Sequence, residues 1–299
     1  MTAPTSPILI TGCSAGLGHT IALHLARRGH RIYATARKPE TLDRLAAHGC
    51  QTLALDVTDE ASMTQAVKRV LHDHGRIGAL VNNAGYAQTG PVEDLSMAEI
   101  RKQFDTNVFG AVRLCQLALP SMRAAGHGRI INIGSLAAHM PLPLWGGYTA
   151  SKAALAAFTN ALRIETAKFN IHATLIEPGY LSTEFTDHVR QNLPATDAGT
   201  AYEADLTGLE SVLSCIHSRT QGQRTTTAAT PAATQCAKVL AALAADPTLV
   251  ARRVERVLAS RRPPARLLVT AHAHAAARLA GLLPQRHWDA TVRALFATR

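Results

Sequence analysis

Residues 8–18, Ile-Leu-Ile-Thr-Gly-Cys-Ser-Ala-Gly-Leu-Gly, decide the fold of this chain. A short apolar run leads directly into a segment that contains Gly12, Gly16 and Gly18, and a helical pattern follows from Leu17. Glycines between a first strand and a first helix permit a tight turn and a close approach of the backbone to a pyrophosphate. The N–H groups at the start of the helix point at that anion. The stretch therefore predicts a strand–turn–helix unit that binds a dinucleotide, with Ser14 in the turn.

The rest of the chain repeats the alternation of a short apolar run with an amphipathic helical pattern. The runs that predict strands are residues 7–11, 31–36, 51–55, 79–81, 129–133, 172–176 and 266–269. Strands of a parallel sheet are buried on both faces, so they are apolar throughout rather than alternating. We therefore expect one α/β domain over residues 1–299. It should be a Rossmann-like, doubly wound, mostly parallel sheet of about seven strands with helices on both faces.

Two segments depart from this pattern. Residues 187–234 are polar, rich in Thr and Ala, and weakly periodic. They predict a variable segment that covers the substrate, and a plain surface insertion is the alternative. Residues 252–299 hold ten Arg and only two acids, which gives a basic C-terminal extension within the same domain. Their only aromatic residues are Trp288 and Phe296, so the stacking surface of a single-strand nucleic-acid binder is absent; a solvated helical face is favoured.

The composition limits the cellular context and the partners. Apolar residues make up 47% of the 299, which is enough for a large core, and the net charge is +10. The five cysteines form no C-x-x-C pair, which predicts a reduced, cytoplasmic chain without disulfides or a metal site. The first residues lack the pattern of a signal peptide, and no apolar stretch is long enough for a membrane span. We expect a small-molecule substrate and neither a nucleic acid nor a membrane span.

The end of the second predicted strand indicates which dinucleotide is bound. An acid about twenty residues after the glycines normally accepts hydrogen bonds from the adenosine ribose of NAD. Here the strand ends in Ala36-Arg37-Lys38, without an acid. Arg37 could instead hold a 2′-phosphate in its guanidinium fork, with help from Lys38. The sequence therefore favours NADP(H), although an ordinary exposed arginine is the alternative.

A tyrosine and a lysine four residues apart predict acid–base chemistry. Tyr148 and Lys152 lie on the same face of a predicted helix. Reduction of a ketone requires a proton donor and a group that stabilises the developing oxyanion. The ordinary pKa of tyrosine is about 10, and a nearby ammonium group is expected to lower it. This pair is common by chance, so its weight depends on the surrounding motifs.

Four further motifs accompany the pair in a fixed order. They are Asn82-Asn83-Ala84-Gly85, Asn107 within Thr106–Gly110, Ser135 after the fifth strand, and Pro178-Gly179 followed by Thr183. Together with T-G-x-x-x-G-x-G, they resemble the motifs of the short-chain dehydrogenase/reductase superfamily over residues 7–185. The opening and the second strand are similar to those of hydroxysteroid and retinol dehydrogenases. The catalytic tetrad of that family corresponds to Asn107, Ser135, Tyr148 and Lys152, all of them intact.

The resemblance implies a role for each matching residue. Tyr148 would transfer the proton, Lys152 would lower its pKa and bind the nicotinamide ribose, Ser135 would polarise the substrate oxygen, and Asn107 would hold a water. Asp56 would contact the adenine end, or act only as a turn residue, and Asn82 would lock the sheet. The full predicted set of cofactor-binding residues is Gly12, Ser14, Gly16, Leu17, Gly18, Arg37, Asp56, Val57, Asn83, Ala84, Gly85, Tyr148, Lys152, Pro178, Gly179 and Thr183.

The loop between Ser135 and Tyr148 should line the substrate pocket, because it joins two catalytic residues. It is mostly apolar, which suggests a bulky, lipophilic alcohol or ketone, although each of these side chains could also pack internally. The predicted pocket residues are Leu136, Met140, Leu142, Trp145 and Tyr180. His139 in the same loop is expected to be solvated rather than a substrate contact.

The resemblance further implies a homodimer or homotetramer through long helices near residues 112–122 and 150–168. Two alternatives to an NADP(H)-dependent alcohol dehydrogenase or ketoreductase stay open. One is a non-redox relative, such as a cyclase, dehydratase or epimerase, and the other is an NADP(H)-sensing regulator. The sequence leaves the substrate, the stereochemistry and the direction of the reaction undetermined.

Overall fold

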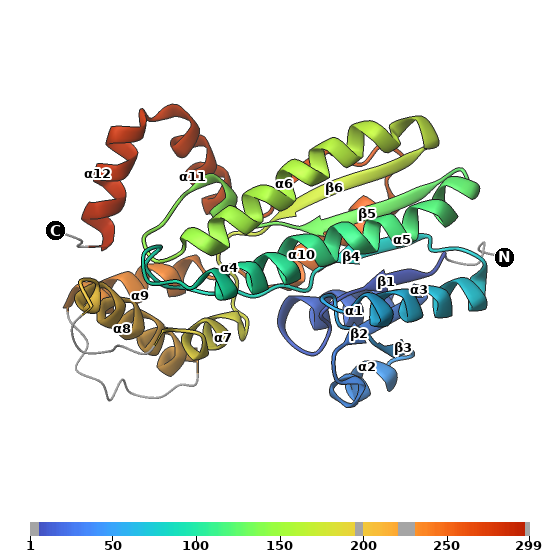
Figure 1. The fold of residues 1–299 in the computed structure, drawn as a ribbon, viewed down its shortest axis with the longest axis horizontal. Helices are drawn as coiled ribbons and strands as arrows, with labels where there is room; N and C mark the ends of the chain where they lie inside the picture. The colour runs from blue at the N-terminus through green and yellow to red at the C-terminus, as the bar shows by residue number, and fades with distance from the viewer. Residues whose placement is uncertain (1–5, 195–199, 221–230, 297–299) are drawn as a thin grey trace.

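A single seven-stranded sheet organises the protein, whose computed structural model describes residues 6–194, 200–220 and 231–296. All strand pairs are parallel, and the spatial order is β3-β2-β1-β4-β5-β6-β7. The strands are β1 (Ile8–Ile10), β2 (Ile32–Ala36), β3 (Gln51–Ala54), β4 (Ala79–Asn82), β5 (Gly128–Ile133), β6 (Ile171–Glu177) and β7 (Arg266–Leu268). The predicted Rossmann-like α/β fold is confirmed (Figure 1).

Helices cover both faces of the sheet and bury a separate apolar core on each (Figure 1). On one face lie α1 (Gly16–Arg27), α2 (Asp43–Ala46) and α10 (Thr248–Ala259). On the other face lie α3 (Glu60–His74), α5 (Gly110–Ala124) and α6 (Gly146–Thr166). Alternate residues of β1 show the division, because Ile8 and Ile10 belong to the first core and Leu9 to the second.

The order of the strands reverses at β1, since the chain moves outward to β2 and β3 and then returns to β4. In open parallel sheets such a reversal leaves a crevice beyond the carboxyl ends of the strands, and ligands bind there. The glycine-rich turn of residues 12–18 lies at this point, between β1 and α1. The fold therefore places the predicted dinucleotide site at the crevice.

Further helices gather at one end of the molecule, beside the carboxyl ends of the central strands (Figure 1). They are α4 (Met97–Phe104), α7 (Phe185–Gln191), α8 (Glu203–Thr220), α9 (Pro231–Leu243), α11 (Ala271–Leu282) and α12 (Gln285–Phe296). Most of the predicted covering segment, residues 187–234, thus belongs to α7, α8, their connection and the start of α9. Residues 195–199 and 221–230 of that segment lie outside the described residues, as do residues 297–299 of the basic extension.

The arginines of the basic extension are spread over several elements rather than one face. Arg252 and Arg256 are exposed on α10, whereas Arg266 on β7 pairs with the buried Glu177. Arg278 and Arg286 are exposed on α11 and α12. Among the helices that the structure describes, none combines the length and the apolar character that crossing a membrane requires.

Candidate active site

The turn between β1 and α1 forms a cradle suited to a diphosphate. Gly12 and Gly16 have positive φ angles of 69° and 56°, which side chains rarely adopt. A Cβ atom on Gly12 would lie 2.8 Å from the Cα of Ala84, so only glycine fits there. The Asn83 amide fixes the turn, because its Nδ2 donates to the carbonyl oxygens of Thr11 and Gly12 at 2.9 and 3.1 Å.

The N-terminus of α1 is open to an anion. Its N-cap residue is Ala15, which makes no side-chain capping hydrogen bond, and no acid occurs in the first turn. The first N–H groups of a helix need partners from outside the helix and carry partial positive charge. A phosphate group fits both requirements. The residues present therefore suit the diphosphate of the predicted cofactor.

The adenosine end of the crevice is lined by residues that follow β2 and β3. Arg37 is exposed and lines the cavity directly after β2. Asp56 Oδ1 accepts hydrogen bonds from the Thr58 amide at 2.9 Å and the Thr58 hydroxyl at 2.7 Å. Asp56 is thus a turn residue that also lines the cavity, and both predicted roles are compatible with this position.

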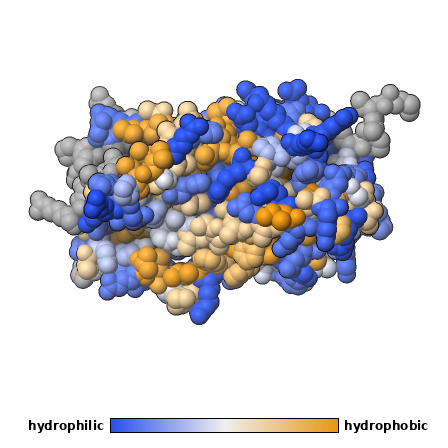
Figure 2. Space-filling view, turned by 90° about the horizontal axis from the view of Figure 1, so that it is seen from above, coloured by the Kyte–Doolittle hydropathy of each residue, from blue (hydrophilic) through white to orange (hydrophobic). Residues whose placement is uncertain are grey.

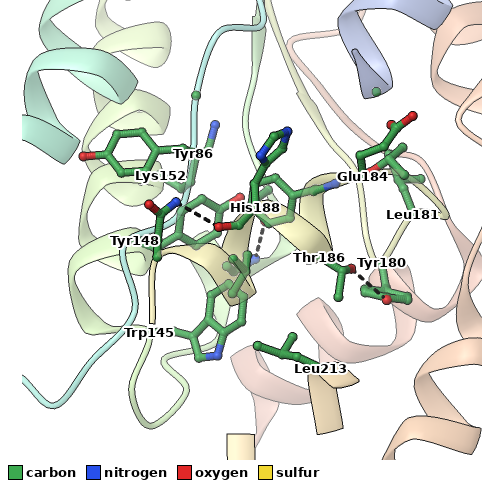
Figure 3. A pocket seen from close by; sticks show the side chains of 18 of the residues that line it. Tyr86, Trp145, Tyr148, Lys152, Tyr180, Leu181, Glu184, Thr186, His188 and Leu213 are labelled. Atoms are coloured by element: carbon green, nitrogen blue, oxygen red, sulfur yellow. Dashed lines mark hydrogen bonds between the residues drawn. The ribbon is translucent and has the colours of Figure 1, made fainter. Parts of the chain in front are cut away.

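Tyr148 lies at the centre of the cavity, where it is 7% exposed (Figure 3). It comes from the first turn of α6. Burial raises the pKa of Tyr148 to about 12, and the hydrogen bond with Ser135 opposes this shift. The expected lowering of the tyrosine pKa therefore does not occur here, because desolvation of the phenolate outweighs its stabilisation. A tyrosine with this pKa is fully protonated at neutral pH, as a proton donor must be.

Lys152 lies one helical turn after Tyr148 and is 5% exposed. Its Nζ donates to the carbonyl oxygen of Ile133 at 2.9 Å and lies 5.9 Å from the centroid of the Tyr148 ring. Burial lowers the pKa of Lys152 to about 8. The ammonium group is therefore held beside the tyrosine at a cost in desolvation.

Asn107 occupies a π-helical turn, Asp105–Phe109, between α4 and α5. Its side chain is almost fully buried and bonds both to the backbone of Tyr86 and to the hydroxyl of Ser151. A Cβ atom on Gly85 would lie 3.1 Å from Asn107 Oδ1 and 3.5 Å from Lys152 Nζ. Asn107 thus lies behind Gly85, close to Lys152. A π-helical turn within a helix often marks a functional site. The helical pattern of the sequence did not reveal this one.

One cavity of about 1840 Å³ joins these groups. All sixteen predicted cofactor-binding residues line it, and Ser135, Tyr148 and Lys152 face it together. The five predicted pocket residues, Leu136, Met140, Leu142, Trp145 and Tyr180, line it as well. The structure therefore brings together every predicted site residue, with Asn107 behind the wall rather than in it.

The wall beside Tyr148 is aromatic and aliphatic (Figure 3). The ring centroids of Trp145 and Phe185 lie 5.7 and 5.9 Å from that of Tyr148. The helices α8 and α9 add apolar residues that sequence analysis missed. They are Leu209, Val212, Leu213, Ile216, Leu240 and Leu243. The weak periodicity of residues 187–234 concealed the four residues of α8.

Two further residues that sequence analysis missed, His272 and Thr186, contact Tyr180 in the Pro178–Thr183 loop and also line the cavity. His272, at the start of α11, accepts a hydrogen bond from the Tyr180 amide at 3.0 Å. Burial lowers the pKa of His272, which favours the neutral ring that can accept this bond. The Tyr180 hydroxyl bonds with the Thr186 hydroxyl at 3.0 Å (Figure 3). His139 is not simply solvated as expected, because its Nε2 lies 3.0 Å from the buried carboxylate of Glu177.

The comparisons with known proteins identify the family. The short chain dehydrogenase model matches residues 6–194, so the chain belongs to that family. A short-chain dehydrogenase from Streptomyces avermitilis has a similar solved structure, with a TM-score of 0.71 and 28% identity. That similarity covers 98% of this chain and 95% of the other.

Two relatives with specific names match the same part of the chain. A 3-ketodihydrosphingosine reductase of Bacteroides thetaiotaomicron is 41% identical over 182 residues, which are 60% of this chain and 66% of the relative. An NADPH-dependent 1-acyldihydroxyacetone phosphate reductase of Schizosaccharomyces pombe is 39% identical over 179 residues, 59% of this chain and 60% of the relative. The chain thus matches slightly less than two thirds of the length of each of these relatives.

Proposed function

We propose that the protein is an NADP(H)-dependent oxidoreductase that interconverts a hydroxyl and a ketone on a bulky, largely hydrophobic substrate. One observation carries the proposal: the anion cradle, the Ser135–Tyr148–Lys152 group and an apolar wall line the same cavity. In such a cavity the carbonyl of a substrate can reach Tyr148 while its apolar body packs on the wall.

The chain's own residues supply the proton and the orientation. In the direction of reduction, the Tyr148 hydroxyl donates its proton to the carbonyl oxygen of the substrate. Ser135 donates a hydrogen bond to the same oxygen and stabilises the charge that develops on it. The Lys152 ammonium stabilises the phenolate that Tyr148 becomes. NADPH supplies the hydride when it is bound.

The choice of NADP(H) rests on Arg37. This cation lines the adenosine end of the cavity, where an acid would favour NAD instead. The guanidinium group suits the 2′-phosphate, which it can bind through two hydrogen bonds. The name of the NADPH-dependent Schizosaccharomyces pombe relative supports the same choice.

The hydrophobic substrate is supported by the wall and by the helices above it. Residues of α7, α8 and α9 line the cavity together with the Ser135 loop, which suits the predicted role of residues 187–234 as a cover. The Bacteroides relative is named a 3-ketodihydrosphingosine reductase, which supports a ketone as the substrate. The name of this relative also favours reduction as the direction of the reaction.

A binding titration tests the cofactor assignment directly. Purified protein is titrated with NADPH and with NADH, and Arg37→Ala is compared with Arg44→Ala, which removes an exposed arginine of α2 that does not line the cavity. We expect NADPH to bind more tightly, and Arg37→Ala to weaken NADPH binding by about 10- to 100-fold, as loss of charge-assisted hydrogen bonds implies. Binding of NADH should stay within about twofold.

The other outcomes are equally informative. A preference for NADH in the unmodified protein contradicts the assignment of Arg37. Equal losses in Arg37→Ala and Arg44→Ala indicate a general charge effect rather than a 2′-phosphate site. If neither nucleotide binds, the proposed oxidoreductase function is wrong. With NADPH bound, a series of apolar ketones of increasing chain length then identifies the substrate class.

A further inference from the structure

A fully buried carboxylate with two partly exposed partners lies outside the catalytic group. Glu177, the last residue of β6, is 0% exposed. Its carboxylate accepts from Arg266 Nε at 2.6 Å and from Arg266 Nη2 at 2.9 Å. It also lies 3.0 Å from His139 Nε2. Three donor atoms from two other elements thus converge on one carboxylate.

These contacts join three segments that are distant in the sequence. Arg266 begins β7, and His139 ends the 3₁₀ turn Leu136–His139. Ser135 is the N-cap of that turn, and its hydroxyl accepts from the Ala137 amide at 3.1 Å. At the first residue of the turn, the Leu136 amide donates to the Pro178 carbonyl at 2.9 Å, whereas His139 contacts Glu177 at the last residue. The turn that carries Ser135 is therefore fastened to the end of β6 twice.

A buried carboxylate is a poor means of stabilising a fold. Removing a charge from water costs several kcal/mol, and apolar residues of similar volume are often as good or better. Such pairs are most useful where they specify one arrangement. Here the arrangement is the placement of the Ser135 turn against the loop that begins at Pro178, both of which line the cavity.

We propose that Glu177 and His139 are positioning residues, which hold the Ser135 hydroxyl at its working distance from Tyr148. Arg266 holds the Glu177 carboxylate in place through two hydrogen bonds. His139, the last residue of the turn, binds the same carboxylate and so holds the turn against β6. Neither Glu177 nor His139 is among the residues that line the cavity. The inference rests on the proposed function for its catalytic consequence, but the placement of the turn is a property of the protein alone.

Substitution of His139 tests the inference with little risk to folding, since this side chain is 23% exposed. His139→Leu removes the donor to Glu177, and His139→Gln restores an N–H donor at similar reach. His172→Leu, at the opposite end of β6, is the matched control. For each protein, hydrogen exchange of the peptide 134–140 is measured without nucleotide, and ketone turnover is measured with NADPH.

We expect His139→Leu to accelerate exchange in residues 134–140 by about fivefold, as loss of roughly 1 kcal/mol of local stability implies. Its kcat should fall about tenfold while the dissociation constant for NADPH stays within twofold. His139→Gln should behave like the unmodified protein in both respects, and so should His172→Leu.

Three results would overturn the inference. They are unchanged exchange in His139→Leu, failure of His139→Gln to restore it, or faster exchange throughout the protein with loss of NADPH binding. Absence of turnover in the unmodified protein would instead overturn the proposed function. The exchange comparison would still decide whether the ion pair positions the turn.

Discussion

At the scale of single residues, the phenol of Tyr148 is the group on which the proposed chemistry depends. Tyr148→Phe removes the proton donor and keeps the buried ring. General acid–base catalysis contributes about 10²- to 10⁴-fold, so we expect kcat for ketone reduction to fall by about that factor. The measurement is ketone-dependent oxidation of NADPH, with the dissociation constant for NADPH measured alongside.

The control for this variant is Tyr202→Phe, whose hydroxyl bonds with Glu93 away from the catalytic group. It should retain full turnover. Retention of turnover in Tyr148→Phe would show that the phenol is not the proton donor. Binding of NADPH without any turnover in the unmodified protein would favour a non-redox relative or a regulator that only binds the nucleotide. These are the two alternatives that the sequence left open.

Substitution of Lys152 should change the stability and the activity of the protein in opposite directions. Burial lowers the pKa of this lysine to about 8 from an ordinary value of 10.5. At pH 7 the folded protein therefore holds a buried charge that water would solvate better. We expect Lys152→Met to raise the free energy of unfolding at pH 7 by roughly 1–3 kcal/mol, since one pKa unit corresponds to about 1.4 kcal/mol. Turnover should be lost.

The pH dependence of this gain has a definite sign. Between about pH 8 and 10.5 the folded protein binds fewer protons than the unfolded chain, so the unmodified protein gains stability as pH rises. The advantage of Lys152→Met should therefore shrink across this range. Urea denaturation at pH 7 and pH 10 measures it. An advantage that is equal at both pH values would contradict the burial of a charged lysine.

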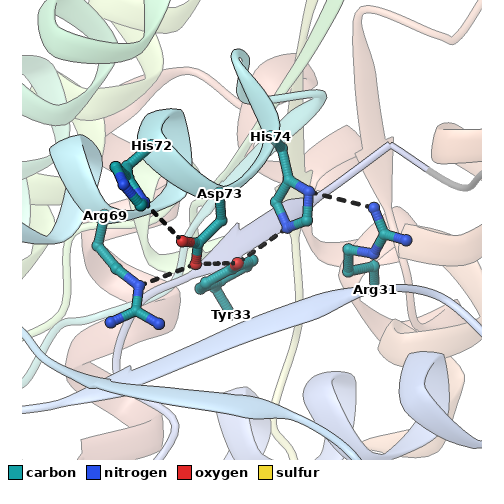
Figure 4. Close-up of polar contacts among 6 residues, drawn as sticks. All are labelled: Arg31, Tyr33, Arg69, His72, Asp73 and His74. Carbon is teal, nitrogen blue, oxygen red and sulfur yellow. Dashed lines mark hydrogen bonds and ion pairs between the residues drawn. The ribbon is translucent and has the colours of Figure 1, made fainter.

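At the scale of elements, a polar network joins β2 to the last turn of α3 (Figure 4). The Tyr33 hydroxyl donates to Asp73 Oδ2 at 2.8 Å and lies 2.9 Å from His74 Nε2. Arg69 binds the same carboxylate oxygen at 2.8 Å, and Arg31 lies 3.2 Å from His74 Nδ1. This network closes the end of the sheet opposite the cavity.

Substitution of Tyr33 should weaken that connection. Tyr33→Phe removes the hydroxyl from a residue that is 2% exposed, and we expect a loss of about 1 kcal/mol in the free energy of unfolding at pH 7. The pKa of Asp73 is lowered by Arg69 first and then by His72 and Tyr33. A lowered carboxyl pKa stabilises the fold above pH 4, and that contribution is lost as pH falls through the folded value.

The difference between Tyr33→Phe and the unmodified protein should therefore narrow in strong acid, measured by denaturation at pH 7 and below pH 3. NADPH binding should be unaffected, because the network and the cavity lie at opposite ends of the strands. A fall in NADPH affinity would show that the two ends of β2 are coupled.

The strands show how far sequence alone can predict the elements. The seven predicted runs match β1 to β7 within one residue at each end. Strands buried on both faces are apolar throughout and end at turn residues, so a local pattern marks them. The glycine turn and the Tyr148–Lys152 spacing are likewise local, and the structure brings them to one cavity.

What the sequence did not predict depends on distant contacts. The ion pair of Glu177 joins residues 38 and 89 positions away, and no local pattern indicates such a pairing. Residues of α8 face both the cavity and α9, so its apolar positions do not form the single stripe of a surface helix. The π-helical turn at Asn107 depends on one inserted residue, which sequence spacing does not reveal.

At the scale of the whole molecule, the helices α5 and α6 have large exposed apolar side chains on or beside them. The two long helices α5 and α6 lie outside the sheet on the same face. Phe109, Phe158 and Ile164, on or beside them, are 54%, 48% and 68% exposed. Figure 2 shows hydrophobic side chains gathered among hydrophilic ones on the face seen from above. A contiguous patch of exposed apolar side chains often marks an interface, whereas scattered single ones do not.

A second copy of the chain is the partner that the family resemblance implies for these helices. We expect the unmodified protein to elute with at least twice the mass of one 31.8 kDa chain, measured by light scattering at micromolar concentration. Phe158→Arg places a charge in the proposed interface and should reduce that mass by half or more. Leu282→Arg, at an 82% exposed position on α11, is the matched control and should not change it.

Phe158→Arg also tests whether NADPH binding depends on assembly of the oligomer. The glycine-rich cradle, Ser135, Tyr148 and Lys152 lie together within a single chain, so we expect a dissociated Phe158→Arg protein to bind NADPH with unchanged affinity. Its thermal stability should become independent of protein concentration, whereas that of the oligomer rises with concentration by mass action. If Phe158→Arg keeps the mass of the unmodified protein, this face is not the interface. If dissociation instead abolishes NADPH binding, the interface orders α6, and Tyr148 and Lys152 depend on the partner for their position.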